Sequence, residues 1–161
     1  MSNKLPLKTL AKARKNGIKI PVRAYLASRK AKIPFYVACA FLEQESAGGE
    51  NVFGHDPSIF SGAGRVTKAK YLRYRAERKR TGKMQGVGPL QLTYWSFQDA
   101  ADRLGGCWKP YNNCLVGFKL IASYWMLGTN GWITVGERYN GSRAYGLQIN
   151  NRINKWKRLL G

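Results

Sequence analysis

One acidic residue, Glu45, stands where a helix would carry an apolar side chain. Residues 34–46 predict a helix whose apolar stripe follows the i, i+3, i+4 spacing and consists of Phe35, Ala38, Phe41 and Leu42. That spacing continues to Glu45, whereas Glu43 projects about 200° of helical turn away, at roughly 100° per residue. Burial against apolar side chains raises the pKa of a carboxyl group, because it disfavours the charged form. Glu45 is therefore a candidate general acid, protonated near neutral pH.

The cysteines and the single histidine do not form a metal-binding pattern. No Cys-x-x-Cys pair is present and His55 stands alone, so we expect neither a metal nor a cofactor. Three cysteines, an odd number, favour thiols in a reducing compartment. Cys39 has the position of a small apolar core residue. Cys107 and Cys114 flank a proline-containing loop, where they either remain free thiols or close a short disulfide.

Three separated motifs occur in order along the chain. They are QES at residues 44–46, GVGPLQLT at residues 86–93 and YNG at residues 139–141. Together they resemble the signature of lysozyme-like lytic transglycosylases and goose-type lysozymes, in which a Glu-Ser pair ends the catalytic helix. The strings NVFGHDP at residues 51–57 and GGCW at residues 105–108 look more particularly like the lysozyme-like domain of endolysins from phages of actinobacteria. The resemblance extends over residues 34–141.

The resemblance implies a lysozyme-like fold with a glycan-binding cleft, and it gives each motif residue a role. Glu45 would protonate the glycosidic oxygen between N-acetylmuramic acid and N-acetylglucosamine. Ser46 would position the substrate or Glu45 through its hydroxyl, and Gln91 would hydrogen-bond sugar amide or hydroxyl groups. Tyr139 would hydrogen-bond the Glu45 carboxyl, and Asn140 would brace the cleft.

The supply of acidic residues bears on the type of reaction. Glycoside hydrolysis commonly uses two carboxyl groups, about 5–5.5 Å apart for retention or about 6.5–9.5 Å for inversion. Asp56 is the best second acid, with Glu50 behind it. A lytic transglycosylase needs a single glutamate, which acts first as acid and then as base while the sugar's own 6-hydroxyl attacks and leaves a 1,6-anhydro end. With only 8 acidic residues we favour the transglycosylase, and a muramidase using Glu45 and Asp56 is the alternative.

Positive charge is concentrated in two segments. The chain has 28 Lys and Arg against 8 Asp and Glu, a formal net charge of +20. Residues 1–32 hold ten basic side chains and no acidic one, and residues 65–83 hold nine against Glu77 alone. Such segments repel themselves unless an anionic partner is near. For an enzyme of this family, the expected partners are peptidoglycan glycan strands and anionic cell-wall polymers, with nucleic acid bound only nonspecifically.

A basic nucleic-acid-binding protein without catalysis is the alternative from another class. The helix predicted over residues 67–80 carries Tyr71 and Tyr74 among seven basic residues, which favours contact with phosphates and stacking on bases. Nucleic-acid binding requires neither the placement of Glu45 nor the three ordered motifs. We therefore favour the glycan-cleaving enzyme.

Helix-capping residues indicate a mainly α fold. Helices are predicted over residues 21–32, over 34–46, over 67–80 with Thr67 as cap, over 94–104 with Thr93 as cap, up to 127 with Asn112 or Asn113 as cap, and from about Arg143 to the C-terminus. A short strand is predicted near residues 18–22, and residues 49–64 read as a loop beside a site. We expect one compact domain over residues 1–161, with residues 1–32 as a basic N-terminal segment.

The expected location follows from what the chain does not contain. The longest apolar run, residues 35–42, is shorter than the roughly 20 residues that a membrane-spanning helix needs. No apolar signal segment follows the basic N-terminus, so we expect synthesis in the bacterial host cytoplasm. The wall would then be reached after holin-type release or from a virion. The strong like charge favours a monomer.

Overall fold

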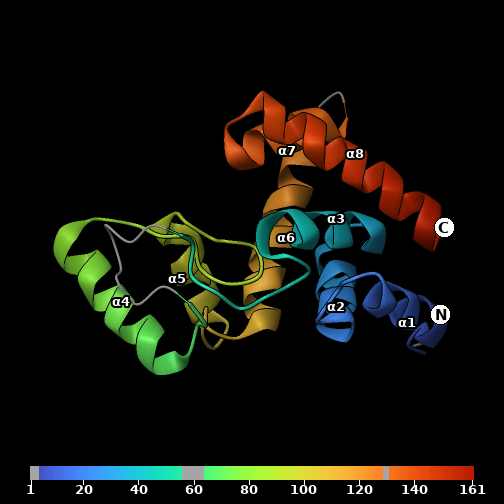
Figure 1. Ribbon diagram of the computed structural model, residues 1–161. Helices are drawn as coiled ribbons and strands as arrows, with labels where there is room; N and C mark the ends of the chain where they lie inside the picture. The colour runs from blue at the N-terminus through green and yellow to red at the C-terminus, as the bar shows by residue number, and fades with distance from the viewer. Residues whose placement is uncertain (1–3, 56–63, 129–130) are drawn as a thin grey trace.

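The computed structural model describes residues 4–55, 64–128 and 131–161, and this part of the chain is mainly helical (Figure 1). Its helices are α1 (Leu7–Lys15), α2 (Pro21–Ala31), α3 (Phe35–Ser46), α4 (Lys68–Thr81), α5 (Trp95–Arg103), α6 (Pro110–Met126), α7 (Trp132–Asn140) and α8 (Arg143–Leu160). The described residues outside the helices form isolated antiparallel bridges instead of strands: Val52 with Arg65, Phe53 with Val87, and Val87 with Leu92. The predicted mainly α class is confirmed.

Helix α6 runs through the middle of the molecule (Figure 1). Helices α4 and α5 lie to its left in this view, α1, α2 and α3 lie to its right, and α7 and α8 lie across the top. Helix α6 contacts α2, α5 and α7, so it joins the two sides. Its buried face extends from Asn112 to Phe118 and includes Ile121 one turn later.

Helix α3 is buried on nearly every side. The consecutive residues 37–42, Cys39 among them, are fully buried, so its core face is wider than the predicted stripe. Helices α2 and α8 pack against it. Burial of each large apolar side chain here, such as Phe41 or Leu42, stabilises the fold by about 1.5–3 kcal/mol. The polar end of α3, which carries Glu45, is thereby held in place by its own apolar half.

The basic N-terminal segment packs on the rest of the protein. Helix α1 buries Leu10 and Ala13, and α2 presents small buried residues toward α3 and α6. The strand predicted near residues 18–22 is wrong, because Ile20 precedes α2 and Pro21 is its first residue. Proline suits that position, since its missing N–H would have no partner in the first turn of a helix.

Helix α4 begins and ends where its capping residues predict. The Thr67 side chain accepts a hydrogen bond from the Lys70 backbone N–H, and Gly82 ends the helix in the left-handed conformation. One face buries Tyr71, Tyr74 and Arg78. Because Tyr71 and Tyr74 are only 0% and 1% exposed, they are not available to stack on bases, and this part of the nucleic-acid hypothesis is wrong.

Two predicted helix caps are wrong for a common reason. The Thr93 hydroxyl donates to the Gln91 carbonyl and caps nothing, while α5 begins at Trp95. Helix α6 already begins at Pro110, so Asn112 and Asn113 lie inside it. In each case the polar side chain forms a hydrogen bond with the backbone of an irregular segment. A local capping pattern does not take such bonds into account.

None of the described helices combines the length and the apolar character that crossing a membrane requires.

Asn113 bonds to two backbone groups of the irregular segment 86–92, and one of them, the Leu90 N–H, has no other hydrogen-bond partner among the described residues. Its Oδ1 accepts from the Leu90 N–H at 3.0 Å, and its Nδ2 donates to the Val87 carbonyl at 2.8 Å. We predict that Asn113→Ala lowers the free energy of unfolding by about 1–3 kcal/mol, because it leaves the buried Leu90 N–H unpaired while the Val87 carbonyl keeps its bond from the Leu92 N–H. Chemical denaturation measures this change.

The neighbouring Asn112 provides the control. It is also buried, but its amide makes one bond, to the Gly106 carbonyl at 3.1 Å. Asn112→Ala should therefore cost less, because the Gly106 carbonyl keeps its hydrogen bond from the Lys109 N–H. Equal losses for the two variants would contradict the role given to Asn113.

Candidate active site

Two adjoining cavities lie at the C-terminal end of α3, and Glu45 lines both. The first, of about 480 Å³, is lined by Glu45, Gly54, His55, Met84, Gln85, Gly86, Gln91, Thr93, Tyr139 and Asn140. The second, of about 460 Å³, shares Glu45, Gly54, His55 and Gln91 with it. Residues of all three sequence motifs, from Glu45 to Asn140, are thus brought to one place. An extended ligand that passes through both cavities would pass the Glu45 carboxyl.

The Glu45 carboxyl is partly buried and has a raised pKa. Burial raises the pKa from the ordinary 4.5 to about 7, and a hydrogen bond from the Tyr145 hydroxyl to Oε1 opposes part of that shift. Desolvation dominates because it penalises the ionised form directly. Close to neutral pH, Glu45 therefore exists in both protonated and ionised forms, as a group that first donates and then accepts a proton requires.

Glu45 also differs from the other described acidic residues in having no cationic partner. Six of the seven form salt bridges: Glu43 with Arg152 and Lys155, Glu50 with Lys19, Glu77 with Arg80, Asp99 with Arg78, Asp102 with Arg75, and Glu137 with Arg143. No Lys or Arg appears among the described residues that line the two cavities. A cation close by would lower the pKa of a carboxyl by about 1–3 units. Because no such cation lines the cavities, the pKa of Glu45 stays raised by burial.

The phenol that contacts Glu45 is Tyr145 of α8, and the predicted role of Tyr139 is wrong in this respect. The Tyr139 hydroxyl donates instead to the Leu90 carbonyl at 2.6 Å. The Tyr139 ring packs edge-on against Phe41 at 5.3 Å and stacks on Tyr145 at 6.4 Å between centroids. Tyr139 therefore supports the side chain that reaches Glu45. Tyr145 lies outside the three motifs, and no pattern in the sequence distinguishes it from the other tyrosines.

The Ser46 hydroxyl is fully used by the protein backbone. It donates to the Pro89 carbonyl at 2.7 Å and accepts from the Gly49 N–H at 3.1 Å, and the side chain is buried. Direct contact between Ser46 and a substrate, one of its two predicted roles, is therefore wrong. The geometry fits the other role, because Ser46 fixes the end of α3 next to Glu45.

Gln91 is likewise engaged with the wall of the cavity. Its Nε2 donates to the Val52 and Gly88 carbonyls, both at 2.9 Å, so this amide N–H₂ group is not available to a sugar. A Cβ at Gly86 would lie 2.5 Å from Gln91 Oε1, which explains why a glycine stands there. Of the predicted sugar contacts of Gln91, only acceptance at Oε1 remains.

Among the described lining residues, the exposed polar ones are Asn140, His55 and Thr93. Asn140 is the last residue of α7 and lines the first cavity, and its amide has no hydrogen-bond partner among the described residues. His55 lines both cavities. The predicted second acid, Asp56, lies outside the described residues, so its distance from Glu45 is not defined.

The cysteines lie away from these cavities. Cys39, Cys107 and Cys114 are free and buried, so the short disulfide considered between Cys107 and Cys114 is not formed. Burial raises the pKa of the Cys107 thiol to about 12, which keeps it protonated. Over the described ranges, no three His, Cys, Asp or Glu side chains come together as a metal site.

Comparisons with protein-family models, with curated proteins and with solved structures find no match to this chain.

The hydrogen bond from Tyr145 predicts which tyrosine controls the proton affinity of Glu45. Because this bond favours the ionised carboxylate, Tyr145→Phe should raise the pKa of Glu45 further above its value of about 7. Tyr139→Phe removes a hydroxyl that bonds to a backbone carbonyl and should leave that pKa in place. A carbon-13 NMR titration of the glutamate carboxyls measures both. A larger shift in Tyr139→Phe than in Tyr145→Phe would reverse the assignment.

The raised pKa also predicts how stability depends on pH. The folded protein holds the Glu45 proton more tightly than the unfolded chain, so this contribution is complete below about pH 4.5 and is lost as the pH rises through about 7. Glu45→Gln, which is neutral throughout, should equal the wild type at about pH 4 and exceed it by about 3 kcal/mol at about pH 8, given about 1.36 kcal/mol per pKa unit.

Denaturation at the two pH values measures the difference, and Glu50→Gln is the control. Glu50 is exposed and paired with Lys19, so that variant should show little change at either pH. A constant difference between Glu45→Gln and the wild type would mean that Glu45 titrates as an ordinary glutamate.

Proposed function

We propose that the protein is a peptidoglycan-cleaving enzyme of the lysozyme-like superfamily, and that Glu45 is its general acid and base. The bond cleaved is the β-1,4 linkage between N-acetylmuramic acid and N-acetylglucosamine. The proposal includes a lysozyme-like fold with the two cavities as its glycan cleft. It rests mainly on one observation. The Glu45 carboxyl, which has no cationic partner among the described residues and a pKa raised to about 7, lines a cavity that is also lined by residues of the other two motifs.

The reaction that fits a single carboxyl is that of a lytic transglycosylase. Protonated Glu45 gives its proton to the glycosidic oxygen as the bond from C1 of the muramic residue to that oxygen breaks. The 6-hydroxyl of the same muramic residue then attacks C1 and passes its proton to the Glu45 carboxylate. One bond to C1 breaks and one forms, no water is consumed, and Glu45 is protonated again. Among the described lining residues, Glu45 is the sole carboxylate, which favours this reaction.

The alternative is a muramidase in which water attacks C1. That reaction needs a second carboxyl or another group to order the water, and Asp56, next to His55 in the sequence, is the residue that could supply it. The two reactions leave different ends on the same glycan fragment. They are therefore separated by the product.

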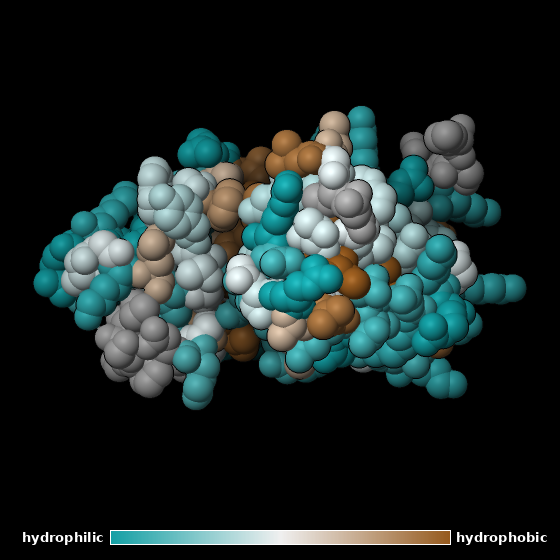
Figure 2. Space-filling model, turned by 90° about the horizontal axis from the view of Figure 1, so that it is seen from above, coloured by the Kyte–Doolittle hydropathy of each residue, from teal (hydrophilic) through white to brown (hydrophobic). Residues whose placement is uncertain are grey.

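The charge distribution supports an anionic polymer as substrate. Peptidoglycan carries free peptide carboxylates and lies among other anionic polymers, which a protein of net charge +20 attracts. In Figure 2, hydrophilic residues predominate at both ends of the molecule, and hydrophobic ones gather between them. The two cavities, in contrast, contain no Lys or Arg among their described lining residues. Attraction by the outer surface and proton transfer at Glu45 thus use different parts of the molecule.

Mass spectrometry of soluble fragments tests the proposal and its alternative together. Purified peptidoglycan is incubated with the wild type, with Glu45→Gln and with Glu50→Gln, which makes the same chemical change at an exposed carboxyl. We predict 1,6-anhydromuramic ends from the wild type and from Glu50→Gln. Glu45→Gln should lose at least about 100-fold in rate, because general acid catalysis contributes about 10²–10⁴.

Each other outcome has a distinct meaning. Reducing muramic ends would replace the transglycosylase by the muramidase. Undiminished cleavage by Glu45→Gln would reject Glu45 as the acid. If several wall chemistries yield no fragments while the protein retains DNA, the nucleic-acid-binding alternative gains.

A further inference from the structure

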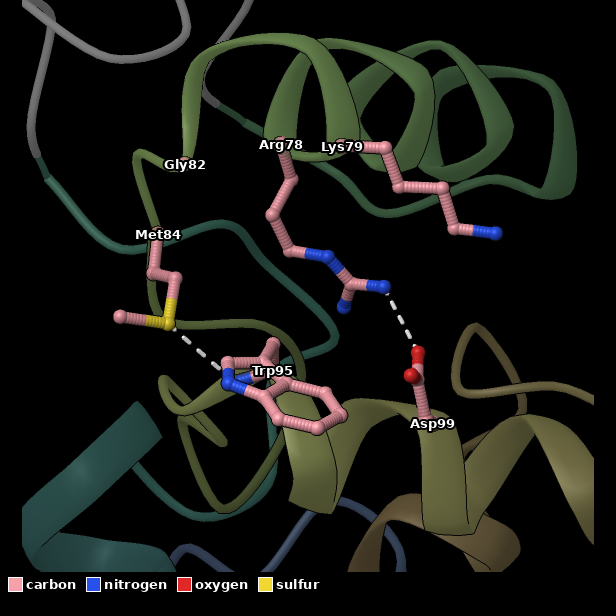
Figure 3. A pocket seen from close by; sticks show the side chains of 6 residues that line it. All are labelled: Arg78, Lys79, Gly82, Met84, Trp95 and Asp99. Carbon is pink, nitrogen blue, oxygen red and sulfur yellow. Dashed lines mark hydrogen bonds and ion pairs between the residues drawn. The ribbon is translucent and has the colours of Figure 1, made fainter.

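A third cavity lies between the C-terminal end of α4 and the start of α5 (Figure 3). It has a volume of about 290 Å³ and is lined by Arg78, Lys79, Gly82, Met84, Trp95 and Asp99. Figure 3 shows Arg78 reaching from α4 toward Asp99, with the indole of Trp95 beside them. The cavity thus combines an aromatic surface, a thioether and charged groups.

Its two cations are in different states. Arg78 is buried, and its guanidinium donates hydrogen bonds to Gln98 Oε1 and to Asp99 Oδ1, both at 2.6 Å. Its charge is therefore already paired within the protein. Lys79 is exposed, and its ammonium has no acidic partner among the residues that the structure describes. A ligand anion at this cavity would therefore be met by Lys79, while Arg78 and Asp99 form a fixed, neutral wall.

The apolar side of the cavity is open to solvent. Trp95 is 49% exposed, and its backbone N–H donates to Met84 Sδ at 3.2 Å, which holds the two side by side. An aromatic ring that is half exposed beside a thioether presents a flat apolar surface to a ligand. Met84 also lines the cavity of Glu45, so the two sites adjoin.

We propose that this cavity binds the peptide of a peptide-bearing glycan, with a peptide carboxylate at Lys79 and an aliphatic part of the peptide on Trp95 and Met84. The proposal rests on the proposed function, since it places a branch of the same substrate next to the strand at Glu45. A carboxylate is favoured over a neutral sugar because α4 is strongly basic and its single acidic residue, Glu77, is already paired with Arg80. Peptide recognition would add specificity to a cleft that otherwise contacts sugars alone.

The test compares two substrates that differ only in the peptide. Glycan strands are used with their peptides attached and after the peptides have been removed by an amidase. Binding is measured by calorimetry with full-length protein carrying Glu45→Gln, so that cleavage does not interfere. Adding Lys79→Gln should weaken binding of the peptide-bearing strands about fivefold, the size of one exposed ion pair. Lys79→Arg should restore most of that loss.

Arg73→Gln is the matched control. Arg73 is exposed on the same helix, forms no ion pair among the described residues and does not line the cavity. Its substitution therefore removes the same charge elsewhere. For the bare strands, Lys79→Gln should weaken binding no more than Arg73→Gln does. If Lys79→Gln weakens binding of both substrates equally, Lys79 contributes only nonspecific electrostatic attraction and the peptide site is rejected. Unchanged binding of the peptide-bearing strands would also reject the site.

These outcomes do not depend on turnover. If the wild type releases no fragments while the peptide-dependent effect of Lys79→Gln persists, the proposed reaction fails and the peptide site stands. If fragments are released and the peptide makes no difference, the reaction stands and the site fails.

Discussion

The irregular segment of residues 86–92 must satisfy its buried backbone groups without a sheet, and the candidate site depends on how it does so. Asn113 of α6 bonds to the Val87 carbonyl and the Leu90 N–H, Ser46 of α3 bonds to the Pro89 carbonyl, and Tyr139 of α7 bonds to the Leu90 carbonyl. Helices from distant parts of the chain thus meet on one short segment. Because an unpaired buried backbone group costs as much as a lost hydrogen bond, these side chains fix the helices relative to one another.

This arrangement changes the meaning of the motif residues. Ser46, Gln91 and Tyr139 are all polar residues that resemble ligand-binding groups in the sequence, yet each uses its hydrogen-bonding capacity on the backbone of the cavity wall. Their effect on the proposed chemistry is indirect, through the position of Glu45. What remains of the motif residues for direct contact with a ligand is Glu45 itself, the exposed Asn140 and the Oε1 of Gln91.

The sequence predicts those features that are determined locally. Helices α2, α3, α4 and α8 begin and end within a residue or two of expectation, because Pro, Thr, Ser and Gly act there through neighbouring backbone groups. Helices α1 and α7 were not expected. The β-branched residues of α7, such as Ile133 and Val135, do not favour a helix, and burial against α6 and α8 overrides this preference. That Tyr145 and not Tyr139 bonds to Glu45 depends on how α8 packs against α3. No local sequence pattern contains this information.

The electrostatics of the protein combine two opposite requirements. A net charge of +20 favours contact with an anionic polymer, but a single Lys or Arg beside Glu45 would ionise it and remove the proton that a general acid must donate. Among the described residues, no Lys or Arg lines the two cavities, and three cations of α4 and α8 are paired with acids elsewhere. Arg78 faces Asp99 at 2.6 Å, and Arg152 and Lys155 of α8 pair with Glu43 on another face of α3. Glu43 thus pairs with two cations of α8, whereas Glu45, two residues further along the same helix, accepts a hydrogen bond from a neutral tyrosine of α8.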